Sequence, residues 1–575
     1  MGAEQGQVVV DGQKLNKVEA LKKAKDGLDV WADIFRYAKA TDMPALDEAQ
    51  QKAFLDAGGR AEDFISSARR NAITEEDFVR LRWWGLYQQL PNLGYFMTRI
   101  RIPNGFVTAV QLAEIADITE QYGRGFADIT TRQNFQLHWV TIESFAAMLP
   151  RLEKVGLVTK FACGDTPRNV VGCPMAGYLA HEHLDASGAV TDVHNMFLAA
   201  GKEFSNFPRK FKTAIGGCHL HCHQPQINDI GLFAVVRKNP ATGQEERGYG
   251  LVVGGGLSTT PHYAQGLRVF IQPGQVVDVC RGIAKIFRDH GYREKRTRAR
   301  LKFLVADWGW QKFRDVLEQT LGFALEHDES ITEPKEAVHT DHMGVGPQKQ
   351  PGLSYIGVPI ERGRITSTQM RAAATIAAKY SPEPKLGLSN KQNLLFLNIP
   401  TAQVSAMVAE LEKAGLSPQA SPWRSTLVTC TGTQFCNLAI VETKERARRI
   451  LKYLEDEIQI DSPIMISVTG CPNSCGQYQI ADIGLMGVVC NFRGVRGTEA
   501  FNLMLGGALG ADPKFATLAL KKIPADYIQK SIGQIVTAYK QNRVDEHETF
   551  HQFVGRHTPA QLAAWLTIPE MAEVL

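Results

Sequence analysis

The sequence predicts an α+β protein assembled from two copies of one folding unit. Segments of the first half recur in the same order in the second half, and each copy opens with the same succession of strand-like and helix-like stretches. A chain of 575 residues also exceeds the size at which a single hydrophobic core usually stops growing. We therefore expect several domains, arranged as two smaller half-domains, each followed by a larger lobe.

The duplication is visible in matching segments that keep their order along the chain. Gln133 corresponds to Gln392 at an offset of 259 residues (392 − 133). GCHLHCHQPQINDIGL (217–232) corresponds to GCPNSCGQYQIADIGL (470–485) at an offset of 253 (470 − 217). An offset that drifts so little over successive matches indicates an internal repeat and not chance similarity.

Each copy reads as a strand, a helix (112–123 and 370–380), an alternating strand and a second helix that ends at glycine. This order is typical of a ferredoxin-like α+β unit, and a longer α/β segment with Gly-rich turns follows it. The polar, Pro- and Gly-rich stretch between the copies reads as a linker. The predicted domains are a helical N-terminal arm (1–85), ferredoxin-like half-domains (86–158 and 353–417), two larger α/β lobes (159–326 and 418–575, the second with a C-terminal tail) and the linker (327–352).

Composition limits the function classes. The formal net charge is +4, from 64 basic and 60 acidic residues, and no long basic run suggests nucleic acid. No apolar run is long enough for a membrane span, and the first residues lack the apolar core of a secretory signal. Ten cysteines in such a chain more often bind metal or carry out redox chemistry than form disulfides. We expect a cytoplasmic protein that contacts neither nucleic acid nor membranes.

Four cysteines of the second half form two close pairs, Cys430 with Cys436 and Cys471 with Cys475. Four thiolates can hold one [4Fe-4S] cluster, because each iron takes one cysteine sulfur. A structural zinc site is the alternative, although zinc prefers gaps of two to four residues, and the first gap has five. An amphipathic helix predicted from 437 to about 457 would place its positive N-terminal end beside Cys436.

The first half keeps one such pair, because Cys218 and Cys222 match Cys471 and Cys475 in the repeat. The sequence gives no partners that match the other two cluster cysteines. We favour a relic of the duplication, and a separate metal site in Cys-His-Leu-His-Cys-His (218–223) is the alternative.

The cysteine segments carry a resemblance. TCTGTQFCNLAIVETK (429–444) and TGCPNSCGQYQIADIGL (469–485) resemble the cluster signature of single-chain, ferredoxin-dependent siroheme sulfite and nitrite reductases, and the resemblance extends over about residues 80–545. It implies that the four cysteines hold a [4Fe-4S] cluster and that Cys475 also bridges to the siroheme iron. It also implies a six-electron reduction of a small oxyanion in siroheme- and cluster-binding lobes behind two ferredoxin-like half-domains.

A polycarboxylate cofactor and an anionic substrate both need paired cations when they are buried. The stretches FMTRIRI (96–102) and FPRKFKTAI (207–215) alternate charged and apolar residues, which places their charges on one face of a strand. For any single arginine or lysine, a solvated surface charge is the alternative. The resemblance implies a substrate-facing set of Arg99, Arg168, Lys210 and Lys212, and the further cofactor-binding candidates are Arg101, Arg132, Gln133, Asn134, Arg209, Tyr87 and Cys163.

Two features bear on the substrate. Sulfite-reducing relatives carry Lys at the second position of the Lys-x-Lys pair, here Lys212, whereas nitrite-reducing relatives usually carry Asn. In the sulfite-reducing branch, a Tyr and a Cys at the places of Tyr87 and Cys163 can form a thioether, with two unlinked pocket-wall residues as the alternative. We therefore favour reduction of sulfite to sulfide. The alternatives are nitrite to ammonia, because the cluster segment resembles plant-type nitrite reductases equally well, and a non-catalytic iron–sulfur electron-transfer protein.

The electron donor is expected to be a separate protein. The chain contains no flavin or nicotinamide fingerprint of the GxGxxG type, and ferredoxin is the usual donor in the family that the chain resembles. The net positive charge and the basic stretch HGYREKRTRARLK (290–302) would attract an acidic ferredoxin. We expect the enzyme to act as a monomer.

Overall fold

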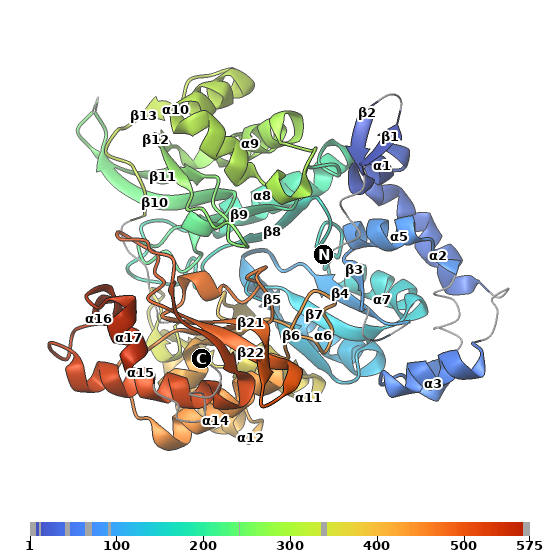
Figure 1. Ribbon diagram of the computed structural model, residues 1–575. Coiled ribbons are helices and arrows are strands. Elements are labelled where there is room, and N and C mark those ends of the chain that lie inside the picture. The colour runs from blue at the N-terminus through green and yellow to red at the C-terminus, as the bar shows by residue number, and fades with distance from the viewer. Residues whose placement is uncertain are drawn as a thin grey trace.

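The computed structural model of the chain describes residues 7–10, 13–40, 46–63, 72–89, 92, 94–240, 242–334 and 342–566 (Figure 1). Parts of the predicted N-terminal arm and of the predicted linker therefore lie outside the described residues. None of the described helices is both long and apolar enough to cross a membrane.

Two five-stranded sheets form the ferredoxin-like half-domains, in the orders β16-β6-β7-β4-β3 and β14-β15-β18-β17-β5. The duplicated α+β architecture predicted from the repeat is confirmed, because the two copies have the same elements in the same order. The first copy contains β3 (Leu86–Gln88), β4 (Phe96–Ile100), β5 (Phe106–Thr108), α6 (Ala109–Tyr122), β6 (Phe126–Ile129), β7 (Phe135–Val140) and α7 (Ile142–Lys154). The second copy contains β14 (Gly344–Pro347), β15 (Leu353–Val358), β16 (Arg364–Thr366), α11 (Ser367–Tyr380), β17 (Lys385–Leu388), β18 (Leu394–Pro400) and α12 (Val404–Lys413).

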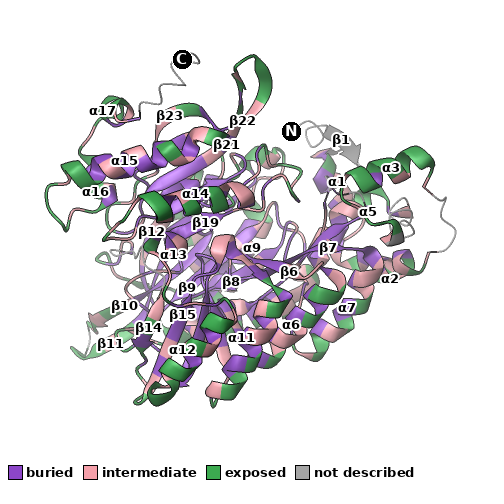
Figure 2. Cartoon of the chain, turned by 90° about the horizontal axis from the view of Figure 1, so that it is seen from below, coloured by how far each residue is buried: buried purple, intermediate pink, exposed green. Residues whose placement is uncertain are grey.

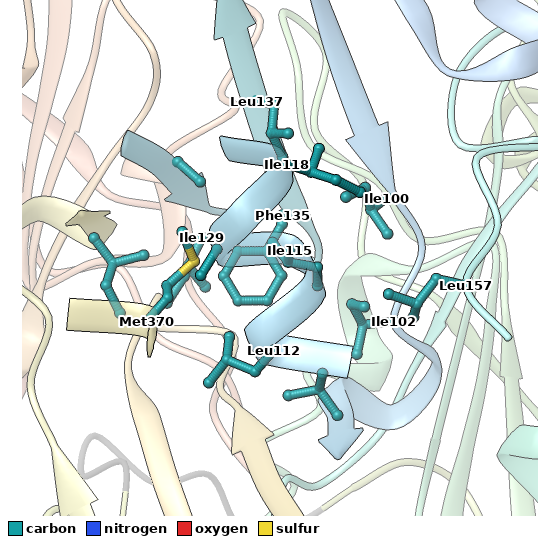
Figure 3. Close-up of a cluster of buried hydrophobic side chains, with 14 of the residues drawn as sticks. Ile100, Ile102, Leu112, Ile115, Ile118, Ile129, Phe135, Leu137, Leu157 and Met370 are labelled. Carbon is teal, nitrogen blue, oxygen red and sulfur yellow. The ribbon is translucent and has the colours of Figure 1, made fainter. Parts of the chain in front are cut away.

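Each half-domain contributes one strand to the sheet of the other. β5 pairs with β17, and β16 pairs with β6, both antiparallel. The helices that follow the exchanged strands, α6 and α11, both start at capping boxes, with Thr108 and Thr366 as the N-caps. Apolar residues of α6 at helical spacing, such as Leu112 and Ile115, pack onto Phe135 and reach Met370 of α11 in one shared core (Figure 3). The two half-domains are therefore one body.

Each larger lobe is built on one sheet that begins with three parallel strands and continues antiparallel. In the first lobe, α8 (Ser187–Ala200), α9 (Val276–His290) and α10 (Leu301–Leu321) accompany β8 (Pro167–Val171), β9 (Phe211–Gly216), β10 (Ile230–Lys238), β11 (Glu245–Val253), β12 (Gln265–Ile271) and β13 (Glu326–His327). In the second, α14 (Lys444–Glu457) and α15 (Ile528–Asn542) accompany β19 (Leu427–Thr429), β20 (Ile466–Thr469), β21 (Ile483–Phe492), β22 (Val495–Leu505) and β23 (Thr517–Pro524). Figure 2 shows the strands buried at the centre and the outward faces of the helices exposed.

Equivalent residues of the two lobes meet across the seam between them. Gln224 and Gln477 exchange two side-chain hydrogen bonds, of 3.2 and 2.8 Å. The rings of Tyr263 and Phe515, which are 252 residues apart in the repeat (515 − 263), stack with centroids 4.0 Å apart. These contacts bring the loop after β9 and the loop after β20, both carriers of Cys-x3-Cys, to the same place.

Three segments differ from the sequence-based expectation. The arm is not only helical: β1 (Gln7–Val10) and β2 (Gln13–Asn16) pair before α1 (Lys17–Ala24), α2 (Trp31–Lys39), α3 (Glu48–Asp56) and α5 (Glu75–Arg80). The predicted linker contains β14, which pairs with β15 as an edge strand. The predicted C-terminal tail forms α16 (Phe550–Gly555) and α17 (Pro559–Ala564), and these helices belong to the core of the second lobe.

Candidate active site at the seam between the lobes

The four predicted cluster cysteines lie together. Cys430 directly follows β19 and Cys471 follows β20, and these neighbouring parallel strands end at the same edge of the sheet. Burial and the nearby charge of Cys475 raise the pKa of Cys430 and of Cys436 to about 11. Burial, and further the charges of Cys475 and Cys430, also raise the pKa of Cys471 to about 11. The mutual influence of these thiols identifies one constellation that could hold a metal cluster.

The spacing of these sulfurs argues against the zinc alternative. Among the residues that the structure describes, no three of the four sulfurs lie within 4.8 Å of one another. A tetrahedral zinc ion with bonds of ~2.3 Å would bring its sulfur ligands to within about 4 Å of each other. A [4Fe-4S] cluster takes each sulfur on a different iron, so its ligands can stand further apart. The backbone N–H of Gly470 donates to Cys430 Sγ at 3.2 Å, a type of contact that tunes cluster potential.

The predicted helix beside Cys436 begins later than expected. α14 starts at Lys444 and not at 437, because the preceding stretch is a loop whose amides serve the cysteine site: Ile440 N–H donates to Gly470 O at 2.7 Å. The residue before the helix, Thr443, donates from Oγ1 to Cys430 O at 2.8 Å. The positive end of α14 therefore faces Cys430 and not Cys436, which corrects the sequence-based prediction.

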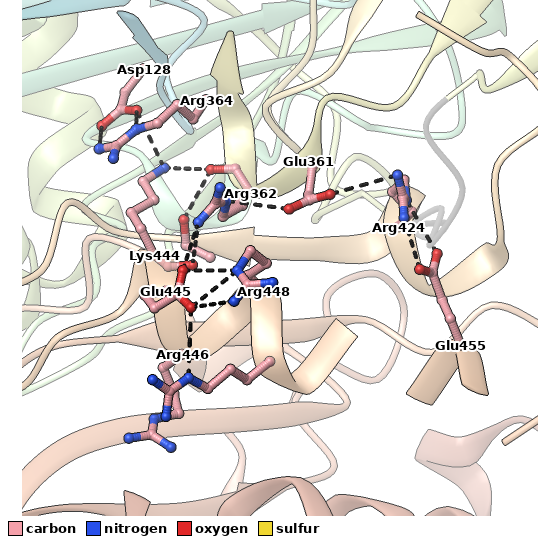
Figure 4. A network of polar contacts seen from close by, with 12 residues as sticks. Asp128, Glu361, Arg362, Arg364, Arg424, Lys444, Glu445, Arg446, Arg448 and Glu455 are labelled. Carbon is pink, nitrogen blue, oxygen red and sulfur yellow. Dashed lines mark hydrogen bonds and ion pairs between the residues drawn. The ribbon is translucent and has the colours of Figure 1, made fainter. Parts of the chain in front are cut away.

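A buried ion network fixes the start of α14 against both half-domains (Figure 4). Lys444 donates to the carbonyl oxygen of Arg362 and lies 3.9 Å from Asp128 of β6. Arg364 makes two hydrogen bonds to Asp128, of 2.8 and 3.1 Å. Burial opposes the ionisation of Asp128, but the charges of Lys444 and Arg364 outweigh it and hold the pKa of Asp128 well below its usual range. The cysteine loop is thus anchored to strands of both halves.

The predicted substrate-facing cations converge from the first lobe and the first half-domain. Arg99 and Arg168 both donate to the carbonyl oxygen of Ala162, at 3.2 and 3.1 Å. Lys210 directly precedes β9, and Lys212 lies within it. Burial, followed by the charges of Arg209 and Arg300, lowers the pKa of Lys210 to about 7. Burial and the charges of three neighbouring cations lower the pKa of Lys212 well below its usual range.

This cluster lacks compensating negative charge. In the described part of the chain, no carboxylate lies within salt-bridge distance of five of these cations, and no acceptor meets the ammonium of either lysine; the five are Arg99, Arg132, Arg168, Lys210 and Lys212. The Nε atoms of Arg132 and Arg168 are also buried without a partner. These cations are half-buried and crowded together without a contacting carboxylate, which is costly, so the site favours a bound anion. A polycarboxylate cofactor with an anionic substrate fits this requirement.

The cysteine site and the cation cluster face each other. Cys475 is exposed, unlike the buried Cys471, and a negative charge on it raises the pKa of Lys210. The hydroxyl of Thr131 donates to the carbonyl oxygen of Cys475 at 3.2 Å, which ties this loop to the first half-domain. Cys475 is therefore the cluster cysteine that opens toward the cations.

Three predicted cofactor-binding residues bond to the protein itself. Arg101 is fully buried and donates to the carbonyl oxygens of Pro167, Arg168 and neighbouring residues. Gln133 donates to the backbone of both halves, including Leu388 O at 2.8 Å, and Asn134 accepts from the N–H of Ile102. These side chains position the loops around the site.

The three other candidates also contact protein groups, and two of them, Arg209 and Cys163, lie at the edge of the cation cluster. Arg209 approaches Asp165 at 3.7 Å, and Cys163 accepts from Arg99 at 2.8 Å. Tyr87 lies on β3 beneath the guanidinium of Arg82, whose carbon is 4.6 Å from the ring centroid.

Sequence reasoning missed the acids that organise the cations. Asp229 is fully buried, accepts from Arg300 at 2.8 Å and from the backbone N–H of Lys212 at 2.8 Å. Asp165 accepts from Arg296 at 2.9 Å. The two arginines belong to the basic stretch 290–302, which the sequence suggested as a docking surface. The sequence contained one indication of Asp229. The tetrapeptide Asp-Ile-Gly-Leu occurs in both copies of the repeat, at 229–232 and 482–485, and Asp229 is the aspartate of the first copy.

Comparison with known proteins decides the family. The model of the nitrite and sulphite reductase 4Fe-4S domain matches residues 163–325 and 423–570, and that of the nitrite/sulfite reductase ferredoxin-like half domain matches 87–155 and 346–414. The chain belongs to the nitrite and sulfite reductase family. It is therefore an oxidoreductase whose cofactors are siroheme and a [4Fe-4S] cluster.

Members of this family that resemble the chain bear both substrate names. A protein of Mycobacterium tuberculosis (strain CDC 1551 / Oshkosh) named sulfite reductase [ferredoxin] is 36% identical over 527 residues, which cover 87% of this chain and 92% of that protein. A ferredoxin–nitrite reductase of Leptolyngbya laminosa is 36% identical, with coverages of 91% and 96%. The solved structure of the Mycobacterium tuberculosis NirA protein superimposes with a TM-score of 0.84 at 35% identity, covering 97% of this chain and all of that one.

Proposed function

We propose that this reductase converts sulfite to sulfide with six electrons from ferredoxin. The observation that carries the choice of sulfite is Lys212, a second ammonium beside Lys210 that has no acceptor in the described chain. Sulfite can bind with two negative charges and three oxygens, whereas nitrite has one charge and two oxygens. A second buried ammonium therefore stabilises sulfite more.

The cysteines and the cations have different roles in the proposed reaction. Cys430, Cys436, Cys471 and Cys475 would hold the [4Fe-4S] cluster, and Cys475, which is exposed on the side of the cations, would link it to the siroheme. Bound siroheme would supply the redox-active iron at which the anion is reduced. Arg132, which also donates to Asn228 Oδ1 at 2.7 Å and to Asn169 O at 2.6 Å, and Arg209 would pair with its carboxylates, which would supply negative charge to the cation cluster.

The substrate-facing cations bind the oxyanion and deliver protons. Arg99 and Arg168 can fix the anion by charge-assisted hydrogen bonds. Lys210, whose pKa is lowered to about 7 by burial and by neighbouring cations, can both hold and release a proton near neutral pH. Two protons delivered from this side for each oxygen would let that oxygen leave as water, while the remaining cations offset the charge that develops.

Nitrite is the second candidate, because relatives with both names match this chain at the same identity. Turnover of both anions by the holoenzyme with reduced ferredoxin tests the proposal. A higher kcat/KM for sulfite, lost in Lys212→Asn, supports it, and a strong nitrite preference that this substitution leaves unmoved contradicts it. A non-catalytic iron–sulfur protein would give no turnover. Such a function would also not explain the two lysines, Lys210 and Lys212, whose ammonium groups have no acceptor in the described chain.

The donor is proposed to be an acidic ferredoxin that docks on the outward-facing part of the stretch 290–302. Lys295 and Arg298 of this stretch are exposed, whereas Arg296 and Arg300 turn inward to Asp165 and Asp229. The docking charge is therefore smaller than the sequence suggested, but long-range attraction needs only exposed cations. We further propose a monomer in the cytoplasm, a reducing compartment that suits ten cysteines with no disulfide among them.

A further inference from the structure

A second compact set of metal-ligand side chains lies in the first lobe, apart from the cluster cysteines. Cys173 follows β8, Cys222 lies in the loop after β9, and His342 stands just before β14. Their ligand atoms all lie within 4.8 Å of one another, and Cys173 Sγ is 3.8 Å from His342 Nε2. Among the described residues, this is the one set of three or more His, Cys, Asp or Glu side chains gathered so closely.

The structure relates this set to the cluster site by the internal repeat. The glutamines of the repeated Gln-Asn pair, Gln133 and Gln392, each accept from the backbone N–H directly before a cysteine, at 3.1 and 2.8 Å. The cysteine is Cys173 in the first half and Cys430 in the second. Cys173 is therefore the counterpart of Cys430, which corrects the sequence comparison that found no partner for it.

With Cys218 and Cys222 matching Cys471 and Cys475, three of the four cluster positions keep a cysteine in the first half. Cys218 is near Cys173, because both belong to one cluster of packed buried side chains, against which Cys222 also packs. The fourth ligand comes from outside the repeat, as an imidazole carried by the segment between the halves.

We propose that Cys173, Cys222 and His342 bind one zinc ion, with Cys218 as the nearest further thiol. Two observations favour a single zinc over a second iron–sulfur cluster. The ligand atoms are closer together than those of the cluster cysteines, as the tetrahedral shell of one ion with bonds of about 2.0–2.3 Å requires. A mixed sulfur and imidazole set is also a usual zinc environment.

The site would fasten the segment between the halves to the first lobe. His342 lies 169 residues from Cys173 in the sequence, so an ion held by both closes a long loop. Its backbone has a φ of 52°, in the left-handed region that a non-glycine residue rarely adopts without a local reason. Its ring packs against Tyr355 of β15, with an edge-to-face centroid distance of 6.3 Å. A structural ion explains why this histidine is held in place.

Metal analysis of the purified holoenzyme tests the proposal independently of reductase activity. We expect stoichiometric zinc in addition to the iron of siroheme and cluster. X-ray absorption at the zinc edge should show two or three sulfurs at ~2.3 Å and nitrogen at ~2.0 Å. Cys222→Ser and His342→Ala should each lower the zinc content at least tenfold while the siroheme absorption stays unchanged. Cys490→Ser, which replaces a cysteine outside this set, is the matched control and should keep the zinc.

Three results would overturn the inference. The first is a holoenzyme with full iron that stays free of zinc after incubation with Zn²⁺ and desalting. The second is zinc retained equally in Cys222→Ser and His342→Ala, since the ion would then lie elsewhere. The third is a Cys173–Cys222 disulfide in non-reducing peptide maps of freshly prepared protein. If Cys222→Ser fails to fold, His342→Ala decides, because His342 is half-buried and outside the lobe core.

Discussion

Lys212→Asn is the substitution that most directly tests how the cation cluster selects its substrate. The ammonium of Lys212 lies among Arg132, Lys210 and Arg300, and Asp229 is the one acid that offsets their effect on its pKa. Asparagine keeps a hydrogen-bond donor at this position but removes the charge. The variant should therefore bind a dianion less well while leaving the other cations in place.

The magnitude follows from the bond that is lost. A hydrogen bond to a charged group contributes about 1.5–3 kcal/mol, which corresponds to about ten- to a hundredfold in kcat/KM for sulfite. Nitrite, with a single charge, should lose less than about tenfold, so the ratio of the two kcat/KM values moves toward nitrite. The siroheme-free protein should become no less stable, because a half-buried cation that lies among other cations without an acceptor is removed.

Steady-state assays with reduced ferredoxin and each anion measure this ratio in wild type and variant. Lys160→Asn is the matched control: Lys160 is also a half-buried lysine of the first lobe, but its ammonium donates to Leu198 O at 3.1 Å and lies outside the cluster. The control should leave the ratio unchanged. An equal loss for both anions in Lys212→Asn, or a nitrite preference of the wild type that does not move, would refute the reasoning.

Four further predictions concern other parts of the site. Cys475→Ser should abolish turnover and shift the siroheme absorption, and an active variant with the wild-type spectrum would contradict the bridging role. Peptide mass mapping should show Tyr87 and Cys163 in one thioether-linked species; two separate peptides would exclude the link. Asp165→Asn should cost about 3–5 kcal/mol of unfolding free energy at pH 7, because it leaves buried cations unpaired. The folded pKa of Asp165 is lowered against burial by the cations around it, so its stabilisation is present above the unfolded pKa of ~3.9 and is lost on acidification; an equal loss at pH 3 and pH 7 would be inconsistent with this. Finally, kcat/KM for ferredoxin should fall as ionic strength rises, and no salt dependence would count against docking on residues 290–302.

The sequence alone determined the features that are local or repeated. The duplication and the order of strands and helices could be read from the sequence, because matching segments such as those at Gln133 and Gln392 recur in register; the exchange of strands between the half-domains could not. The cluster cysteines were readable because each pair is close in sequence, so its spacing constrains the metal that it can hold. Composition also indicated a metal-binding or redox protein. Ten cysteines in a chain whose first residues lack the apolar core of a secretory signal more often bind metal than form disulfides.

The tertiary structure decided which of the many charged residues serve the site. Arg99 and Arg101 were expected on one face of a strand, and both donate to carbonyl oxygens of the segment that follows residue 160; only burial separates them, because Arg101 is fully buried among backbone carbonyls whereas Arg99 is half-buried beside Cys163. Asp165 and Asp229 come close to arginines that are far from them in sequence, which no local pattern reveals. Burial and hydrogen-bond partners depend on residues that are distant in the sequence. Only they distinguish a cation that is available to bind an anion from one that is already paired within the protein.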